Sequence, residues 1–359
     1  MLPLDDKRLL VSRFWRGASG FWRLTSARLL FALLVSSTVL QLVLQYRLNY
    51  WSRDFFDAFG RKDGTALRSE AFLFLLLAGL SVAVAILLIW ARMTAQRKWR
   101  AWLTGHLIEQ WLANERIRHL HFQKDEDSNP EYRIAEDARV ATDAPISMAA
   151  GLLSAILSAV TFIGILWNVG GDLVVGIDGY MLTVPKYLVL TVLVYSALLT
   201  LGMMLIGRRM VHTIAGKNAA EAQFRSVASH LREYRSAAAA QDARPAQLTS
   251  MGDSFETVVS RWQDLCVQFM RTTLISTGNT LAAPIIAWVL CAPKYLAGAM
   301  SLGEVAQAVA AFVMVQTALN WFVDNYPGLA ECLSSVNRVG SLLVALDEVD
   351  APKIRLAAE

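Results

Sequence analysis

"AFLFLLLAGLSVAVAILLIWARMTAQRKWRAWLTGHLIEQWLAN", residues 71–114, is an apolar run that continues without a break into a basic, tryptophan-rich pattern. Its first 21 residues, Ala71–Ala91, carry no charge, and about 20 apolar residues cross a bilayer as a helix. From Arg92 onward there is no proline, and Trp and Leu recur at helical spacing. The stretch predicts one helix from Ala71 to about Gln123, roughly 75 Å long. About 45 Å of it would stand beyond the ~30 Å hydrocarbon core.

The composition of the chain agrees with a membrane location. It has 359 residues, of which 55% are hydrophobic and 18% are charged, whereas soluble domains carry about 25% charged residues. We therefore expect an all-α integral membrane protein, with an N-terminal cytoplasmic or interfacial helix in 1–28, a six-span domain over 29–323, and a cytoplasmic C-terminal helix and tail in 324–359. The predicted spans are 29–45, 71–91, 146–167, 187–206, 273–292 and 305–323.

Lysine and arginine are divided unevenly between the two sides of these spans. Of the 34 basic residues, 27 lie in the N-terminal segment, the two long connections and the tail, and 7 lie in the other three connections. The positive-inside rule therefore predicts cytoplasmic termini and long connections, in a multi-pass protein of the bacterial inner membrane. Asp5–Leu24 mixes aromatic and aliphatic residues with arginines, which predicts a helix lying on the inner leaflet.

The two long connections, 92–145 and 207–272, follow one design. In the second, Arg208–Ser236 and Leu248–Arg271 have helical patterns on either side of a tip at 237–245. Each connection can be a solvated helical hairpin. However, a pillar that stands in water with Trp and Leu on its faces favours a partner that covers them. Six spans with two such arms resemble the exporter-type ABC transmembrane domain, in which the arm tips press on nucleotide-binding domains.

Motifs spread over residues 25–348 carry a more specific resemblance. They include YWSRDFFDAFGRKD (50–63), NPEYRIAEDARVATD (129–143), FIGILWNVGG (162–171) and WFVDNYPGLAECLSSVNRV (321–339). In them the chain resembles bacterial ABC half-transporters grouped with the peroxisomal fatty-acyl transporters, and through them the SbmA/BacA peptide-uptake proteins. The resemblance implies a homodimeric permease subunit for peptides, peptide-like antibiotics or cobalamin-sized cargo, imported or exported. On the second arm, plain alanines in YRSAAAAQDARPAQ replace the family's longer motif.

The sequence carries no G-x-x-x-x-G-K-[ST] loop, whose backbone amides and lysine would hold phosphates. The related half-transporters continue into an ATPase domain after a stretch like SVNRVGSLLVALDE, so we expect no enzymatic activity and no cofactor in these residues, with ATP and Mg²⁺ bound only through a partner ATPase. Three alternatives stay open. Transport can run on a proton gradient, as in SbmA/BacA proteins; the sequence can be a fragment of a longer half-transporter; or the protein can be a membrane scaffold or regulator that transports nothing.

The first arm contains the most specific motif. Asn129-Pro130 predicts a turn, and Glu136 and Asp137 follow Arg133 at the i,i+3 and i,i+4 spacings of helical ion pairs. One interpretation is a self-contained helix cap with a salt bridge. The resemblance favours a coupling arm that contacts the ATPase, formed by Asn129, Pro130, Arg133, Glu136 and Asp137.

Polar side chains recur inside two predicted spans, where such residues are costly and more often functional. On the first span these side chains lie every four residues, and on the sixth span they form a similar stripe. The expected substrate pathway comprises Gln41, Gln45, Gln307, Gln316 and Asn320, accompanied by Ser37 and Asn49. The alternative is hydrogen bonding between helices. Glu304 and Asp324, at opposite ends of the sixth span, are the candidates for proton coupling, and Glu304 can equally be a helix cap.

Other classes of site have little support in the sequence. The three cysteines form no C-x-x-C pattern and are expected to be single thiols. The two histidines of HLH, residues 119–121, would point apart on a helix, so no metal site is predicted. The basic residues follow the membrane topology, and we therefore expect lipid as a partner and no nucleic acid.

Overall fold

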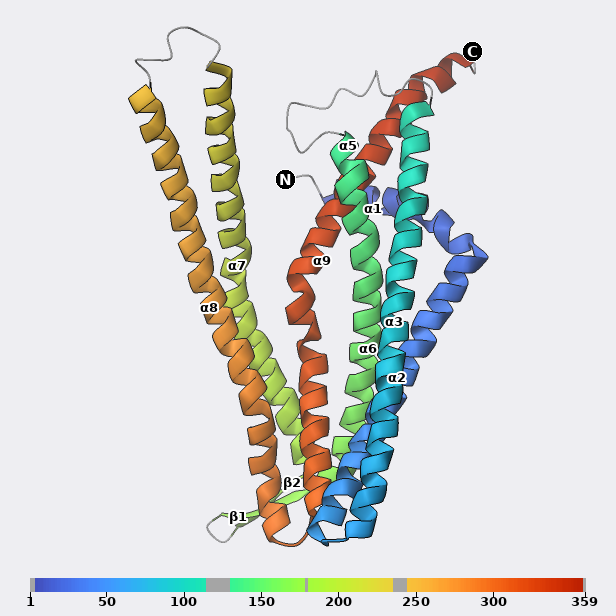
Figure 1. Ribbon diagram of the computed structural model, residues 1–359, viewed down its shortest axis with the longest axis vertical. Helices are drawn as coiled ribbons and strands as arrows, with labels where there is room; N and C mark the ends of the chain where they lie inside the picture. The colour runs from blue at the N-terminus through green and yellow to red at the C-terminus, as the bar shows by residue number, and fades with distance from the viewer. Residues whose placement is uncertain (1–3, 114–129, 178–179, 235–243, 358–359) are drawn as a thin grey trace. The chain divides into compact units, whose positions relative to one another are not determined.

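The computed structural model describes residues 4–113, 130–177, 180–234 and 244–357 (Figure 1). Its elements, in chain order, are α1 (Leu4–Ala18), η1 (Ser19–Arg23), α2 (Thr25–Gly60), α3 (Gly64–Leu112), α5 (Pro130–Tyr132), η4 (Arg133–Asp137), α6 (Ala138–Gly170), β1 (Leu173–Ile177), β2 (Tyr180–Val184), α7 (Tyr187–Tyr234), α8 (Arg244–Leu296) and α9 (Leu302–Ala357). The described chain is almost entirely helical.

Six helical segments are long and apolar enough to cross a membrane. They are Thr25–Gly60, Gly64–Leu112, Pro130–Gly170, Tyr187–His230, Leu248–Leu296 and Leu302–Tyr326. The predicted all-α, six-span fold is therefore confirmed. Several helices are much longer than a span needs, since α3, α7 and α8 have 49, 48 and 53 residues, against about 20 for the hydrocarbon core.

The chain forms two compact units, Met1–Gly171 with Cys291–Glu359, and Asp172–Leu290. In the first unit α6 packs most extensively against α9, and α2 packs against both α3 and α9. Its core is built from large apolar side chains that these helices turn toward one another, among them Phe14, Trp99, Phe162 and Phe312, each at most 1% exposed. Within the predicted spans, close packing of these side chains holds the helices together. Outside them, burying Phe14 and Trp99 away from water contributes about 1.5–3 kcal/mol per side chain.

Helix α1 runs crosswise to α3 and α9 (Figure 1) and is docked on the C-terminal part of α9. Close approach requires Gly340, because a Cβ there would lie 2.5 Å from the carbonyl oxygen of Leu10. Arg13 donates two hydrogen bonds to the Asp347 carboxylate, at 2.6 and 2.9 Å. These bonds raise the pKa of Arg13 above its ordinary value, and the ion pair helps to hold α1 in place.

Helix α3 ends before the position that the sequence predicts. We expected an unbroken helix to about Gln123, but α3 ends at Leu112, where Ala113 adopts extended backbone with ψ 143°. Residues 114–129, which include the rest of that prediction, lie outside the described residues. After this gap the described chain resumes at Pro130, a residue suited to a helix start because it lacks an N–H, and continues through η4 into α6.

The second unit consists of the antiparallel helices α7 and α8 with a small hairpin. The hydroxyl of Tyr187 donates to the Leu290 carbonyl, Tyr195 donates to Asn279, and Gln268 donates to the Ile206 carbonyl. Strands β1 and β2 pair from Leu173 with Val184 to Ile177 with Tyr180. This hairpin was not predicted from the sequence, although Asp178-Gly179 between two apolar runs is a strong hairpin signal.

The start of α3 offers a pH prediction, because the carboxylate of Asp63 is its N-cap. Asp63 accepts the Thr65 hydroxyl at 2.6 Å and the backbone N–H groups of Thr65 and Ala66 at 3.0 and 3.1 Å. These bonds, the one from the Thr65 hydroxyl foremost, hold the pKa of Asp63 below its usual value. The cap therefore stabilises the start of α3 fully at a pH above the ordinary aspartate pKa. This stabilisation is lost as the pH falls through the lowered pKa of Asp63.

We expect amide exchange in the first turn of α3 to speed up as the pH falls below 4, after correction for intrinsic exchange. Asp63→Asn keeps an acceptor that does not titrate, so its exchange should follow the intrinsic rate across that range. An Asp63→Asn protein with the same acid-induced opening as the wild type would show that another group is responsible.

Candidate functional site

At the base of the first arm, a network of hydrogen bonds joins the start of α6 to α9. Asp137, whose side chain is 1% exposed, receives two bonds from Arg338, at 2.8 and 2.6 Å. Arg133 donates to the hydroxyl of Ser341 at 2.7 Å, and that hydroxyl donates to the Arg338 carbonyl at 2.9 Å. We call Asp137, Arg338, Arg133 and Ser341 the arm clamp. It fixes the arm stem to α9 through charge-assisted bonds whose carboxylate is buried, while the Arg338 side chain is partly exposed.

The acidic residues of the arm motif have other partners than predicted. Glu136 forms its ion pair with Arg139, and Asp137 forms its ion pair with Arg338, while the Asp137 carboxylate also interacts electrostatically with Arg133. Arg133–Asp137 is a π-helical turn, which winds more widely than an α-helix and changes the faces on which i+3 and i+4 lie. Asn129 lies outside the described residues, and Pro130 begins α5. A coupling role for the motif stays a prediction.

Two buried polar residues, Asn49 and Gln307, meet between α2 and α9. The side-chain amide of Asn49 donates to the backbone carbonyl of Gln307 at 3.1 Å. Gln307 is completely buried, and neither its amide nitrogen nor its oxygen has a hydrogen-bond partner among the described residues. The Oδ1 atom of Asn49 is also enclosed and unpartnered in that part of the chain. We call Asn49 and Gln307 the polar seam. Ser37 and Gln316 are also buried, further along α2 and α9.

The remaining residues of the two predicted stripes have different surroundings. Gln41 donates to the hydroxyl of Ser81 at 3.0 Å and so bonds α3, which is the helix–helix alternative for this residue. Gln45 is half-buried, Asn320 has an enclosed Oδ1 without a partner in the described chain, and Asp324 is exposed. Residues that are regularly spaced in the sequence therefore have different structural surroundings. The pathway role of these residues stays a prediction.

Glu304 forms the N-terminal cap of α9. Its carboxylate accepts the backbone N–H of Ser301 at 2.9 Å, and the Ser301 hydroxyl accepts the N–H of Glu304 at 3.1 Å. This reciprocal arrangement is a capping box. The carboxylate is engaged in the cap that the sequence offered as the alternative to proton coupling, and the coupling role itself stays untested.

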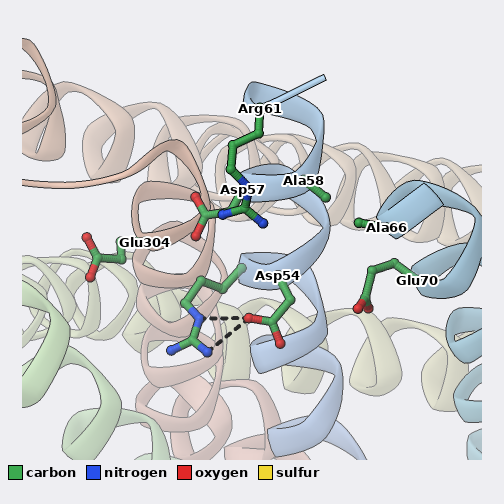
Figure 2. A pocket seen from close by; sticks show the side chains of 8 residues that line it. Asp54, Asp57, Ala58, Arg61, Ala66, Glu70 and Glu304 are labelled. Carbon is green, nitrogen blue, oxygen red and sulfur yellow. Dashed lines mark hydrogen bonds and ion pairs between the residues drawn. The ribbon is translucent and has the colours of Figure 1, made fainter. Parts of the chain in front are cut away.

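A polar pocket of about 340 Å³ lies beside this cap. Figure 2 shows Asp54, Asp57 and Arg61 on one stretch of α2, between Glu304 of α9 and Glu70 of α3. Asp57 accepts the backbone N–H of Gly303 at 2.9 Å, and Arg53 pairs with Asp54 at 2.9 Å. The pocket is thus lined by charges of both signs, most of which form hydrogen bonds or ion pairs within α2 or with α9. It lies at the end of the unit opposite the arm clamp.

Several residues that build these sites were not singled out from the sequence. Arg338 and Asp57 lie within motifs quoted for the family resemblance, but their partners Asp137 and Gly303 are 201 and 246 residues away along the chain. The S-x-x-E pattern of Ser301 and Glu304, by contrast, is a local signal that could have identified the cap.

Comparison with known proteins adds to this geometry. A family model described as "ABC transporter transmembrane region 2" matches residues 21–296, more than three quarters of the chain. The "Inner membrane ABC transporter ATP-binding protein YddA" of Escherichia coli is 25% identical over 337 residues, which cover 92% of this chain and 60% of that protein. "ABC transporter D family member 2, chloroplastic" of Arabidopsis thaliana is 21% identical over 346 residues, covering 96% of this chain and 47% of the relative.

A third relative is an uncharacterized ABC transporter ATP-binding protein of Synechocystis. It is 25% identical over 284 residues, covering 76% of this chain and 40% of the relative. The chain therefore spans 40 to 60% of the length of these curated relatives.

Proposed function

Because the chain belongs to the ABC transporter transmembrane region 2 family, we propose that it is the membrane-spanning permease component of an ABC transporter in the bacterial inner membrane. The observation that carries this is the match over residues 21–296 onto helices that extend far beyond a span. We place the arms and both termini in the cytoplasm, since 27 of the 34 basic residues lie there in that orientation.

We propose that ATP supplies the energy, bound with Mg²⁺ to a nucleotide-binding domain on a partner chain or in a longer product. The three relatives are ABC transporters, two of them named ATP-binding proteins, and this chain spans about half of their length. The 359 residues contain no phosphate-binding loop, so the nucleotide does not fit a site here. These residues would transmit a conformational change of the nucleotide-binding domain from the arms to the membrane-spanning helices.

The arm clamp and α9 provide a route for that motion within one unit. Helix α9 has 56 residues, about 84 Å at 1.5 Å per residue, and passes the capping box, the polar seam and the clamp in turn. Because Arg338 holds the base of the first arm through buried Asp137, α6 and α9 move together when the arm is displaced. Such rigid coupling suits a transition between two packings of the spans.

The polar seam is proposed to border the cargo pathway. Buried polar atoms without partners, as on Gln307 and Asn49, are costly in a bilayer and mark hydrated or substrate-lined routes. We propose a homodimer, since two copies of such a subunit enclose a pathway. The resemblance to SbmA/BacA proteins favours a peptide, a peptide-like compound or a cobalamin-sized molecule as cargo.

Uptake of a fluorescent peptide in cells with and without the gene tests this proposal and separates its rivals. We expect transport that stops when ATP is depleted and continues when a protonophore collapses the proton gradient. The opposite pattern would replace ATP with gradient coupling. Equal fluorescence in cells with and without the gene, for cobalamin-sized probes as well as peptides, would favour a scaffold or regulator.

A further inference from the structure

The polar pocket beside the α9 cap is built by three helices of one unit. Asp54, Asp57 and Arg61 are spaced by three and seven residues, which places them on one side of α2. Helix α3 contributes Glu70, and the first turn of α9 contributes Glu304 (Figure 2). The volume of about 340 Å³ lies at the lower end of the range for sites that bind small molecules. The pocket is therefore large enough for a ligand of a few heavy atoms.

The lining of this pocket carries more negative than positive charge. Its four carboxylates and two guanidiniums have a formal net charge of −2. Arg53 donates two hydrogen bonds to one oxygen of Asp54, at 3.0 and 2.9 Å, and lies 5.0 Å over the ring of Tyr50. Arg61 is exposed and interacts electrostatically with Asp63, which does not line the pocket. The excess of carboxylates therefore favours a ligand that is positively charged.

The carboxylates also keep acceptor oxygens that receive no donor from the described part of the chain. Asp54 and Asp57 accept hydrogen bonds through Oδ1 alone, and Glu304 accepts through Oε2 alone. The side chain of Glu70 has no hydrogen bond or ion pair with any described residue, and its Oε2 atom is enclosed by the protein. A charged oxygen that is removed from water and has no donor is costly. A ligand that donates hydrogen bonds to Glu70 would offset this cost.

The placement of the carboxylates fits an organic cation better than a metal ion. Among the described residues, no three acidic, histidine or cysteine side chains lie close enough together to hold one metal, whereas Ca²⁺ takes about six to eight oxygen ligands. A primary ammonium group needs no such convergence, because its three hydrogens can be donated to separate oxygens. The pocket therefore offers the acceptors that an ammonium compound requires.

We propose that this pocket binds a small organic molecule through a primary ammonium group, with Glu70 as its main ion-pair partner and Asp54 as a second acceptor. Arg61 is at the exposed edge and repels the same ligand, so that it limits the affinity. The proposed orientation puts the site on the extracytoplasmic side, and only that placement rests on the proposed function. Binding itself depends neither on the energy source nor on transport.

Titration calorimetry on the full chain in neutral detergent tests the site with 1,4-diaminobutane as the probe. We expect the diamine to bind, whereas 1,4-butanediol and butanedioate, which have the same chain length without the positive charges, should not. Glu70→Gln keeps the size of the side chain and removes its charge, so it should weaken diamine binding about tenfold or more. Arg61→Gln removes a repulsion and should strengthen binding about twofold. A variant that only damaged the fold would weaken binding, so the opposite signs separate recognition from structure.

The matched control is Glu256→Gln, which removes an exposed carboxylate from the arm portion of α8 and should bind the diamine as the wild type does. The proposal is overturned if the wild type binds no diamine, if the diol binds as tightly, or if Glu70→Gln and Glu256→Gln have equal effects. Displacement of the diamine by an equal concentration of Mg²⁺ would also contradict it and assign the pocket to a metal ion. Because this assay involves no transport, its failure would leave the permease proposal standing, and a failed uptake experiment would leave this binding result standing.

Discussion

Arg338→Met is expected to lower the free energy of unfolding of the protein by about 3 kcal/mol, the lower end of the range for breaking a buried ion pair. The Asp137 side chain is only 1% exposed, and the change leaves its carboxylate without its bidentate partner. We choose the lower end because the Arg338 side chain is 38% exposed, so that water screens part of the interaction. Equilibrium unfolding in mixed detergent and denaturing micelles measures the difference.

Arg139→Gln is the control for this experiment. It breaks the pair with Glu136, in which the two side chains are 40% and 43% exposed, and exposed pairs contribute less than about 1 kcal/mol. A double change, Asp137→Asn with Arg338→Met, removes both charges and should recover part of the loss. Equal small effects of Arg338→Met and Arg139→Gln would mean that the arm clamp contributes no more than a surface contact.

Gly303→Val is expected to have an effect of similar size at the other end of α9. A Cβ at this position would lie 2.1 Å from the carbonyl oxygen of Arg53 and 2.6 Å from the Asp57 carboxylate. Backbone cannot yield as a side chain does, so α2 and α9 must separate, at a cost of about 3 kcal/mol, the upper part of the range for overpacking. The same separation would break the hydrogen bond from Gly303 to Asp57.

Gly79→Ala provides the matched comparison, since a Cβ there meets nothing within 4 Å. In the middle of α3 it should be neutral or stabilise the helix by about 0.5–1 kcal/mol. The same unfolding assay serves both variants. If Gly303→Val were as stable as Gly79→Ala, the close packing of α2 on the start of α9 would not be a property of the folded protein.

The membrane fold could be predicted because hydropathy and charge are properties of local sequence. The run Ala71–Ala91 specifies a span wherever its helix packs, and each of the other five spans was likewise predicted from an apolar run of its own. The sites could not be predicted in the same way. The partner of Asp137 lies 201 residues away, and nothing in the spacing of the arm motif indicates which face of α9 will meet it. Periodicity gives a residue's side of its own helix but not the neighbouring helix.

Two local features show where the sequence analysis was incomplete. The π-helical turn at Arg133–Asp137 altered the phase on which the predicted ion pairs depended. On the polar stripes, residues spaced by four were expected to share one environment, yet Gln41 bonds α3 whereas Asn49 bonds α9. The helix turns by 100° per residue, so a spacing of four drifts slowly around the axis and reaches a different neighbour after a few turns.

The central claim is that the arms stand in the cytoplasm, where an ATPase can act on them, and side-specific thiol labelling tests it most directly. In a background with Cys266, Cys291 and Cys332 replaced, single cysteines are introduced at Gly60, the exposed last residue of α2, and at Arg225 on the α7 arm. With an impermeant reagent we expect Gly60→Cys to label in intact cells, and Arg225→Cys to label only in inverted membrane vesicles. Labelling of Arg225→Cys in intact cells would contradict the account, because no cytoplasmic ATPase could then reach that arm.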